Sequence, residues 1–159
     1  MPATIHTDQV WREVEKGMFA VLGMVTAKAE ARTAGIVYLV RDRHLYITTD
    51  RSSWKTKHIE KNPNVSLTVT IPKRIPFLPW IRIPAATITF RGEASVHGMD
   101  EVPAEIPQAL MRGLEMGQEI VSDICIIRIK PKGHFVTYGV GVSLQTMRKP
   151  EAAGGRAPV

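Results

Sequence analysis

The sequence predicts a mainly β (α+β) fold in which an antiparallel barrel carries two or three helices at its rim. Six or seven short segments have the apolar alternation or the β-branched content of strands, and short turns join most of them. Strands and long helices do not alternate regularly, which argues against a doubly wound parallel sheet. Closure of the sheet would hide its edge strands, so a barrel is the expected form.

The N-terminal part predicts one helix followed by three strands. Thr7 or Asp8 can cap a helix that ends near Gly17. The buried stripe of this helix would consist of Val10, Trp11 and Val14. Strands are expected at residues 18–26, 34–40 and 44–49, and the tight turn 41–43 joins the last two as a hairpin.

A hydroxyl-rich and basic turn then leads into a short helix. The helix is expected from about Ser52, as its cap, to Lys61, where Asn62-Pro63 stops it. The turn and the first helical positions carry four hydroxyls and three cations: Thr48, Thr49, Ser52, Ser53, Arg51, Lys55 and Lys57. Because a helix N-terminus presents unpaired N–H groups and a partial positive charge, this segment can attract phosphate. Ordinary capping hydroxyls and surface lysines would give the same pattern.

The second half predicts more strands around an unusual loop. Strands are expected at 64–71, 85–96, 122–130 and 133–143, and a helix in the later part of 100–117. Gly92 inside its strand indicates a bulge or a close backbone approach. The loop 72–84 holds four prolines together with many apolar residues. It is either packed on the body or a partner subunit, or it is a lid or an apolar patch that meets lipid or a hydrophobic substrate.

Length and composition place further bounds on the chain. Its 159 residues favour a single domain, which we assign to residues 1–148, followed by a flexible tail at 149–159. The lone Cys125 excludes an internal disulfide and a multi-cysteine metal site, and its apolar surroundings predict a buried, inert thiol. No run of about 18 apolar residues exists, so no transmembrane segment is expected. The polar N-terminus lacks the apolar stretch of a leader, which makes the cytoplasm the default location.

The net charge of +6 admits an anionic partner. Nucleic acid is one possibility, but few aromatic residues stand beside the cations, so we do not expect it. A small phosphorylated cofactor needs only two or three of these cations. The histidines are scattered without a metal-ligand spacing, and we assign neither a metal site nor a catalytic residue.

The segment from Thr33 to Thr70 resembles the core of the flavin-binding split-barrel family, whose best-known member is pyridoxamine 5′-phosphate oxidase. The resemblance is carried by a hairpin, Thr48-Thr49, Ser53-x-Lys55, a helix and Asn62-Pro63-x-Val-Ser-Leu. It implies a six-stranded antiparallel split β-barrel that binds FMN at a homodimer interface. The family also accommodates the deazaflavin coenzyme F-420, and a non-enzymatic flavin, haem or lipid binder on the same barrel is a further alternative.

The resemblance also implies roles for individual residues. Thr48 and Thr49 match the strand-end pair that touches the cofactor, and Ser53 and Lys55 match the phosphate-binding pair. Trp54 stands where the oxidase has an arginine on the phosphate, so Arg51 or Lys57 would have to supply that charge. The C-terminal substrate-binding motif of the oxidase is not recognisable. The resemblance therefore implies a flavin-dependent oxidoreductase that acts on another, unknown substrate, with a cofactor site at Thr48, Thr49, Ser53, Trp54, Lys55 and Lys57.

Overall fold

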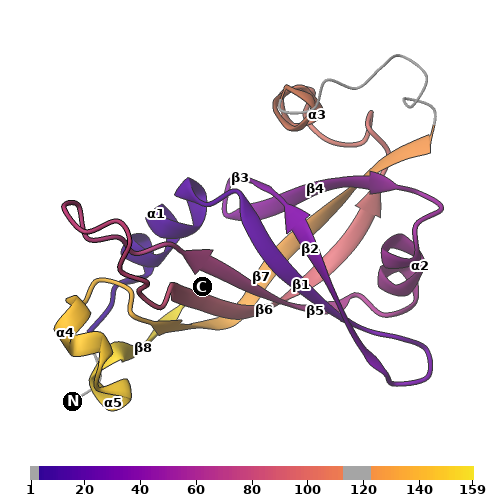
Figure 1. Cartoon of the computed structure of the whole chain (residues 1–159). Helices are drawn as coiled ribbons and strands as arrows, with labels where there is room; N and C mark the ends of the chain where they lie inside the picture. Colours follow the sequence, from indigo (N-terminus) through magenta and orange to yellow (C-terminus); the bar gives the residue numbers. More distant parts are fainter. Residues whose placement is uncertain (1–3, 113–122) are drawn as a thin grey trace.

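The computed structural model describes residues 4–112 and 123–159, and its main feature is a curled antiparallel sheet with helices around it (Figure 1). The strands are β1 Phe19–Val25, β2 Ala31–Val37, β3 Leu39–Arg41, β4 His44–Asp50, β5 Asn64–Ile71, β6 Ala86–His97, β7 Ile124–Tyr138 and β8 Gly154–Pro158. The helices are α1 Thr7–Lys16, α2 Trp54–Lys61, α3 Glu105–Met111, α4 Leu144–Met147 and α5 Pro150–Ala153. The predicted fold class is confirmed, although the described residues form eight strands rather than six.

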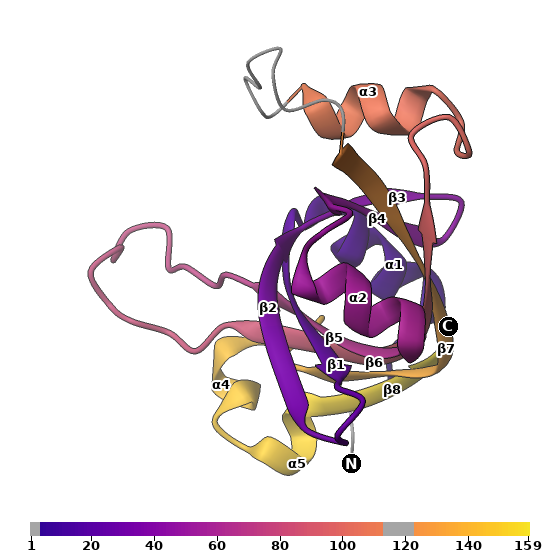
Figure 2. The same ribbon diagram turned by 90° about the vertical axis from the view of Figure 1, so that its right-hand side faces the viewer.

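The strand order explains why the barrel is split. It runs β2-β1-β5-β6-β7-β4-β3, with β8 pairing to β7 beside this path. The two edge strands, β2 and β3, are consecutive in the chain and are separated only by Tyr38. The sheet therefore curls until its two edges meet at one corner, which Figure 2 shows beside α1 and α2. Within the described residues no ladder joins β2 to β3.

The hairpin predicted at residues 41–43 is confirmed as the link between β3 and β4. Arg41 pairs with His44, and the two residues between them, Asp42 and Arg43, both have positive φ (48° and 57°). This is the conformation that a two-residue type I′ turn requires.

The strands expected at 122–130 and 133–143 form one strand instead. The continuous β7 bends at Gly133, whose φ is +80°, and the β6–β7 register shifts at the same level, between Thr89 and Arg91. The close approach expected at Gly92 is confirmed, because a Cβ atom there would lie 2.8 Å from the Ile129 side chain and 3.1 Å from the Lys130 carbonyl oxygen.

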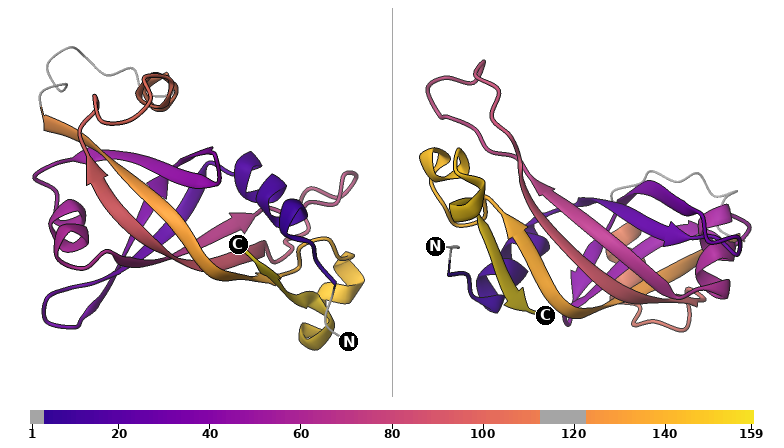
Figure 3. Two further views of the ribbon diagram at one scale, coloured as in Figure 1. Left: turned by 180° about the vertical axis from the view of Figure 1, so that it is seen from behind. Right: turned by 90° about the horizontal axis from the view of Figure 1, so that it is seen from below.

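The C-terminal segment differs from the flexible tail expected at 149–159. Residues 150–153 form α5, and β8 pairs with β7 from Tyr138↔Gly154 to His134↔Pro158. Ala153 and Ala157 are buried, and the Thr7 hydroxyl donates to the Pro158 carbonyl oxygen at 2.7 Å. Figure 3 shows β8 alongside β7, with the short helices that precede it at the same end of the molecule.

The main core fills the barrel and is closed by a helix near each end. The stripe predicted on α1, Val10, Trp11 and Val14, is buried, and Trp11 makes an edge contact with Phe135 at 5.3 Å between ring centroids. Ile59 of α2 joins the same core. A second, smaller cluster lies outside the barrel, where Ile106 of α3 packs with Tyr46 and Ile126 on the outer face of β4 and β7. The rest of the helix expected within 100–117 lies outside the described residues.

The segment between β5 and β6, residues 72–85, projects from the body of the molecule (Figures 1 and 2). We call it the β5–β6 loop. It leaves the sheet at the end where α4 and α5 lie, and α2 lies at the opposite end in all views of Figures 1 and 3. Among the described residues, no helix has the length and apolar character needed to cross a bilayer.

Candidate functional site

The six residues that the sequence singled out lie at the end of β4, in the following turn and in α2. Thr48 and Thr49 lie near the end of β4, and α2 begins at Trp54. The cap of α2 is Ser53 rather than the expected Ser52. Ser53 has an extended backbone, and its Oγ atom accepts a hydrogen bond from the Thr56 backbone N–H at 3.3 Å. A serine hydroxyl in this position satisfies one of the free N–H groups of the first turn.

A small network of hydroxyls fixes the geometry of this turn. Thr49 Oγ1 lies 3.2 Å from Ser53 Oγ, which lies 3.1 Å from Thr56 Oγ1. The Thr56 hydroxyl donates to the Asp50 carbonyl oxygen at 2.8 Å. Thr56 is completely buried, yet the sequence did not single it out. The sequence signal that could have identified Thr56 is its position three residues after the serine cap. At that spacing both the Thr56 hydroxyl and its backbone N–H can reach the Ser53 hydroxyl.

Cys125 lies beneath the hydroxyl network. It pairs with Thr49 in the β4–β7 ladder, and its Sγ atom is 3.9 Å from Thr56 Oγ1. Burial raises the pKa of the Cys125 thiol, so the neutral thiol predominates at neutral pH. The expectation of a buried thiol is confirmed. Cys125 contributes to packing beneath the turn, and we assign it no role as a nucleophile.

The two candidate threonines point to opposite faces of β4. Leu45 and Ile47 belong to the main core, whereas Tyr46 belongs to the outer cluster. Because side chains alternate along a strand, Thr49 faces inward toward Ser53, and Thr48 faces outward with Tyr46. The structure therefore groups Thr49 with Ser53 and places Thr48 on the other side of the sheet.

The two candidate lysines lie on different sides of α2. Lys55 is half-buried, and its Nζ atom lies 5.6 Å from the ring centroid of Trp54, which is 44% exposed. Lys57 is exposed, and two residues along a helix correspond to a rotation of about 200°. Lys55 thus lies against the Trp54 ring near the start of α2, while Lys57 points to another side of the helix.

The first turn of α2 carries positive charge without local compensation. It contains no acidic residue. Within residues 4–112 and 123–159, neither Lys55 nor Arg51 forms an ion pair, and the backbone N–H groups of Trp54 and Lys55 have no hydrogen-bond partner. Two N–H groups and an ammonium at a helix start form a donor set that suits one phosphate group. The exposed Asp50 is the nearest carboxylate in the sequence and would repel an anion that approached from its side.

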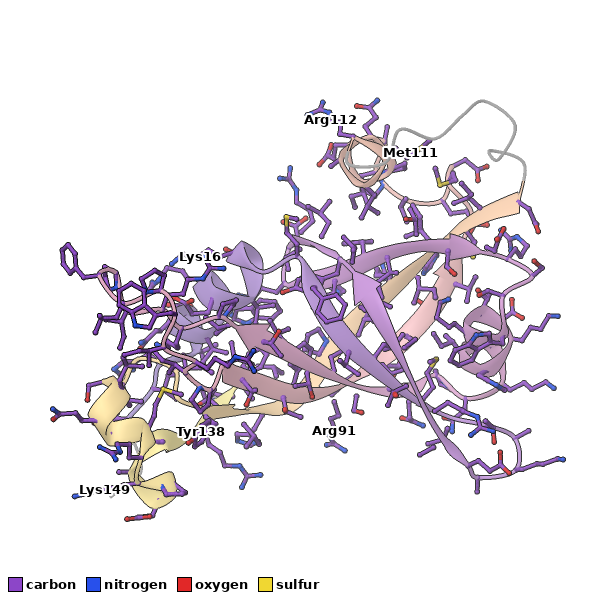
Figure 4. The ribbon with its side chains drawn as sticks, in the orientation of Figure 1. Lys16, Arg91, Met111, Arg112, Tyr138 and Lys149 are labelled. Carbon is purple, nitrogen blue, oxygen red and sulfur yellow. The ribbon has the colours of Figure 1, made fainter. Side chains whose placement is uncertain are left out.

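A second basic surface was not predicted from the sequence. Arg91, His134 and Arg156 line a hollow on the outer face of the sheet together with Ser66 and Thr89. Figure 4 shows the Arg91 side chain pointing away from the sheet. These residues come from β5, β6, β7 and β8, so no local pattern in the sequence could bring them together.

The described histidines do not gather into a metal site. No group of three His, Cys, Asp or Glu side chains with metal-binding geometry occurs in the part of the chain that the structure describes. Both ring nitrogens of His97 have neighbours, since Nε2 lies 2.7 Å from Ser95 Oγ and Nδ1 lies 3.8 Å from a Glu101 carboxylate oxygen.

Comparisons with known proteins show the fold and leave the activity open. No family model and no curated protein matches this sequence. Among solved structures, a candidate pyridoxamine 5′-phosphate oxidase from Listeria innocua aligns with a TM-score of 0.60 and 18% identity, over 78% of this chain and 91% of the other. An F420 reductase aligns with a TM-score of 0.56 and 17% identity, over 78% and 93% of the two chains. A heme-binding protein from Mycobacterium smegmatis aligns with a TM-score of 0.71 and 11% identity, over 99% of this chain and 60% of the other.

The likeness to the split-barrel family, inferred first from the segment around Thr49 and Lys55, is thus confirmed at the level of the fold. Proteins with this fold include one named for F420 reduction and one named for heme binding. Identities of this size identify a shared architecture. The chain has the split-barrel fold of the pyridoxamine 5′-phosphate oxidase-like proteins.

Proposed function

We propose that this protein binds FMN, with the phosphate at the N-terminus of α2, and acts as a flavin-dependent oxidoreductase. The observation that carries the proposal is the donor set of the first turn, where the Lys55 ammonium and two backbone N–H groups have no ion-pair or hydrogen-bond partner in the described residues. An FMN phosphate carries about two negative charges, and charge-assisted hydrogen bonds to it are roughly twice as strong as neutral ones.

The residues of the turn divide the work of holding such a cofactor. Ser53 and Thr49 fix the shape of the turn, and Lys55 supplies the charge. Trp54 places an apolar ring at the position where the oxidase has a phosphate-binding arginine. Arg51 and Lys57 add positive potential from a greater distance. Thr48, on the outer face of β4, is a candidate contact for another part of the cofactor.

The bound flavin would itself carry the electrons or hydride, and the protein would supply placement and hydrogen bonds. The absence of an assigned acid or base is compatible with this division.

A homodimer with the cofactor at its interface is part of the proposal. Phe19 of β1 pairs with Val37 of β2, so their side chains share one face of the sheet, and they are 50% and 63% exposed; Met18, which directly precedes β1, is 69% exposed. An exposed apolar patch on a sheet face is a common feature of subunit interfaces. Sedimentation equilibrium of Phe19→Ser beside the wild-type protein tests this part separately.

Two other ligands compete with FMN on the same fold. Coenzyme F-420 also bears a phosphate, so the donor set of α2 would serve it as well. Haem binding is suggested by the heme-binding neighbour, and its test is the absorbance spectrum of the purified protein after haem is added. A strong Soret band with no affinity for either flavin would replace the proposal with a haem-binding one.

The decisive experiment compares two ligands and two lysines. Lys55→Ala should weaken FMN binding by about ten- to a hundredfold, because a hydrogen bond to a charged group contributes about 1.5–3 kcal/mol. Riboflavin, which lacks the phosphate, should lose little. Lys57→Ala removes the same charge on the other side of the helix and serves as the matched control. Equal losses for FMN and riboflavin in Lys55→Ala would show that Lys55 does not contact the phosphate.

A further inference from the structure

The β5–β6 loop exposes an unusual amount of apolar surface. Phe77 is 88% exposed and Trp80 is 74% exposed, and Leu78 and Ile81 between and beside them are also exposed. Large aromatic side chains are rarely left in water to this extent unless they contact something else. Figure 2 shows the ribbon of this loop projecting well away from the barrel, and Figure 4 draws the molecule with its side chains.

The backbone of the loop is restrained in a way that presents these side chains. Four prolines limit its conformations, which lowers the entropy lost on binding. Two successive turns form the tip, with Leu78 N–H donating to the Ile75 carbonyl oxygen and Ile81 N–H to the Leu78 carbonyl oxygen, both at 3.1 Å. Backbone groups satisfied in this way cost less when they leave water.

The charge of the loop is entirely positive. Lys73 and Arg74 precede the apolar tip, and Arg82 follows it. No aspartate or glutamate occurs anywhere in residues 61–92, the segment that contains β5, the loop and most of β6. Lys149 lies at the same end of the molecule (Figure 4). An apolar aromatic tip with cations at its base has the composition of segments that lie in the interface of an anionic bilayer.

The other possible occupants fit these observations less well. Nucleic acid would stack on Phe77 and Trp80, but aliphatic side chains such as Leu78 have no partner on a stacked base. A second copy of this basic chain would bring like charges together around the tip. A lid over the site of the same chain is excluded by position, since α2 lies at the opposite end of the molecule (Figures 1 and 3).

We propose that the β5–β6 loop docks the protein on an anionic lipid surface, with Phe77 and Trp80 inserted among the lipid headgroups and Lys73, Arg74 and Arg82 on their phosphates. The proposal is independent of which cofactor the α2 site binds. Each cation near an anionic surface contributes about 1 kcal/mol, which corresponds to about a fivefold change in partition. Removing all three should therefore weaken binding by about a hundredfold.

Vesicle co-sedimentation of the full-length chain tests this proposal. We expect binding to vesicles that contain phosphatidylglycerol and much weaker binding to phosphatidylcholine alone. Neutralising Lys73, Arg74 and Arg82 to Gln should cost about a hundredfold. The matched control, Lys28, Lys61 and Arg112 to Gln, makes the same change in net charge away from the loop and should lose far less. Phe77→Ser with Trp80→Ser should reduce binding by at least about tenfold while leaving the charge intact.

Tryptophan fluorescence gives a second readout that does not depend on the variants' affinity. Trp80 emission should shift to the blue on the anionic vesicles, and Trp80→Phe should abolish the shift while it retains binding. Absence of binding to anionic vesicles would overturn the proposal, as would equal losses in the loop variant and its charge control. A loop variant that instead dissociates a dimer, with vesicle binding unchanged, would assign the loop to a second copy of the chain.

Discussion

Replacing Ser53 with alanine should lower the free energy of unfolding by about 1.5 kcal/mol. Loss of a serine cap typically costs about 1 kcal/mol, because an N–H group of the first turn loses its acceptor. Ser53 also meets the hydroxyls of Thr49 and Thr56 at 3.2 and 3.1 Å. Each of those hydrogen bonds is worth roughly 0.5–1.5 kcal/mol net, partly recovered where water can replace Ser53. The cap and the network together therefore give about 1.5 kcal/mol.

Thermal unfolding monitored by circular dichroism measures this effect. For a chain of this size, about 1.5 kcal/mol corresponds to a fall in Tm of about 3–6 °C. Ser143→Ala is a matched control, because Ser143 caps α4 with the same pattern, accepting from the Thr146 N–H at 3.2 Å and lying 2.9 Å from its hydroxyl. That network is exposed and its helix has only four residues, so we expect about 0.5 kcal/mol there.

The comparison can refute the reasoning in two ways. Equal shifts for Ser53→Ala and Ser143→Ala would show that the half-buried network around α2 contributes nothing beyond an ordinary cap. An unchanged Tm for Ser53→Ala, combined with complete loss of FMN binding, would show that the hydroxyl serves the ligand and not the helix.

Three further predictions concern the barrel. Tyr38→Phe removes the hydroxyl that donates to the Val14 carbonyl oxygen at 2.7 Å and should cost about 1 kcal/mol at neutral pH. Burial raises the pKa of Tyr38 above its ordinary value of 10.0, so the unfolded chain loses this proton first. The free energy of unfolding of the wild-type protein should fall as the pH rises above about 10. Denaturant titrations at several pH values should show that this fall with pH is smaller for Tyr38→Phe. Gly92→Ala should lower Tm because its Cβ would meet the Lys130 carbonyl oxygen at 3.1 Å, whereas Gly154→Ala, with its nearest atom at 3.7 Å, should not. Cys125 should resist a thiol reagent such as dithionitrobenzoate in the folded protein and react at once in denaturant; rapid labelling of the folded protein would contradict its burial.

The features that the sequence predicted correctly have local causes. The hairpin at 41–43 follows from a short polar turn between two β-prone segments, and the end of α2 follows from Asn62-Pro63. The stripe on α1 follows from helical spacing of apolar residues. Even the cap of α2 was misplaced by only one residue, since Ser52 and Ser53 carry the same hydroxyl and only the reach to the Thr56 N–H distinguishes them.

The features that were missed depend on contacts between distant segments. The segment 154–158 has small side chains and little apolar alternation, and only its ladder with β7 orders it as a strand. Arg91 and Arg156 share a hollow because β6 and β8 flank β7, which no spacing in the sequence reveals. The opposite orientation of Thr48 and Thr49 does follow from strand alternation, but the expectation that both touch one cofactor came from the family resemblance and did not use it.

The donor and acceptor roles in the hydroxyl network indicate which residue of the α2 turn should govern phosphate affinity. The Thr56 hydroxyl donates to the Asp50 carbonyl oxygen, so its lone pair can accept from Ser53. Ser53 Oγ in turn accepts from the Thr56 N–H and can accept from Thr49. With these bonds made, neither Ser53 nor Thr49 has a proton left for a ligand unless the network breaks. Lys55 retains all three of its ammonium protons, because no acceptor holds them within the described residues. Lys55→Ala should therefore impair FMN binding with little effect on Tm, and Ser53→Ala should lower Tm with a smaller effect on FMN binding. The reverse pattern would mean that phosphate binding opens the network and uses the hydroxyls directly.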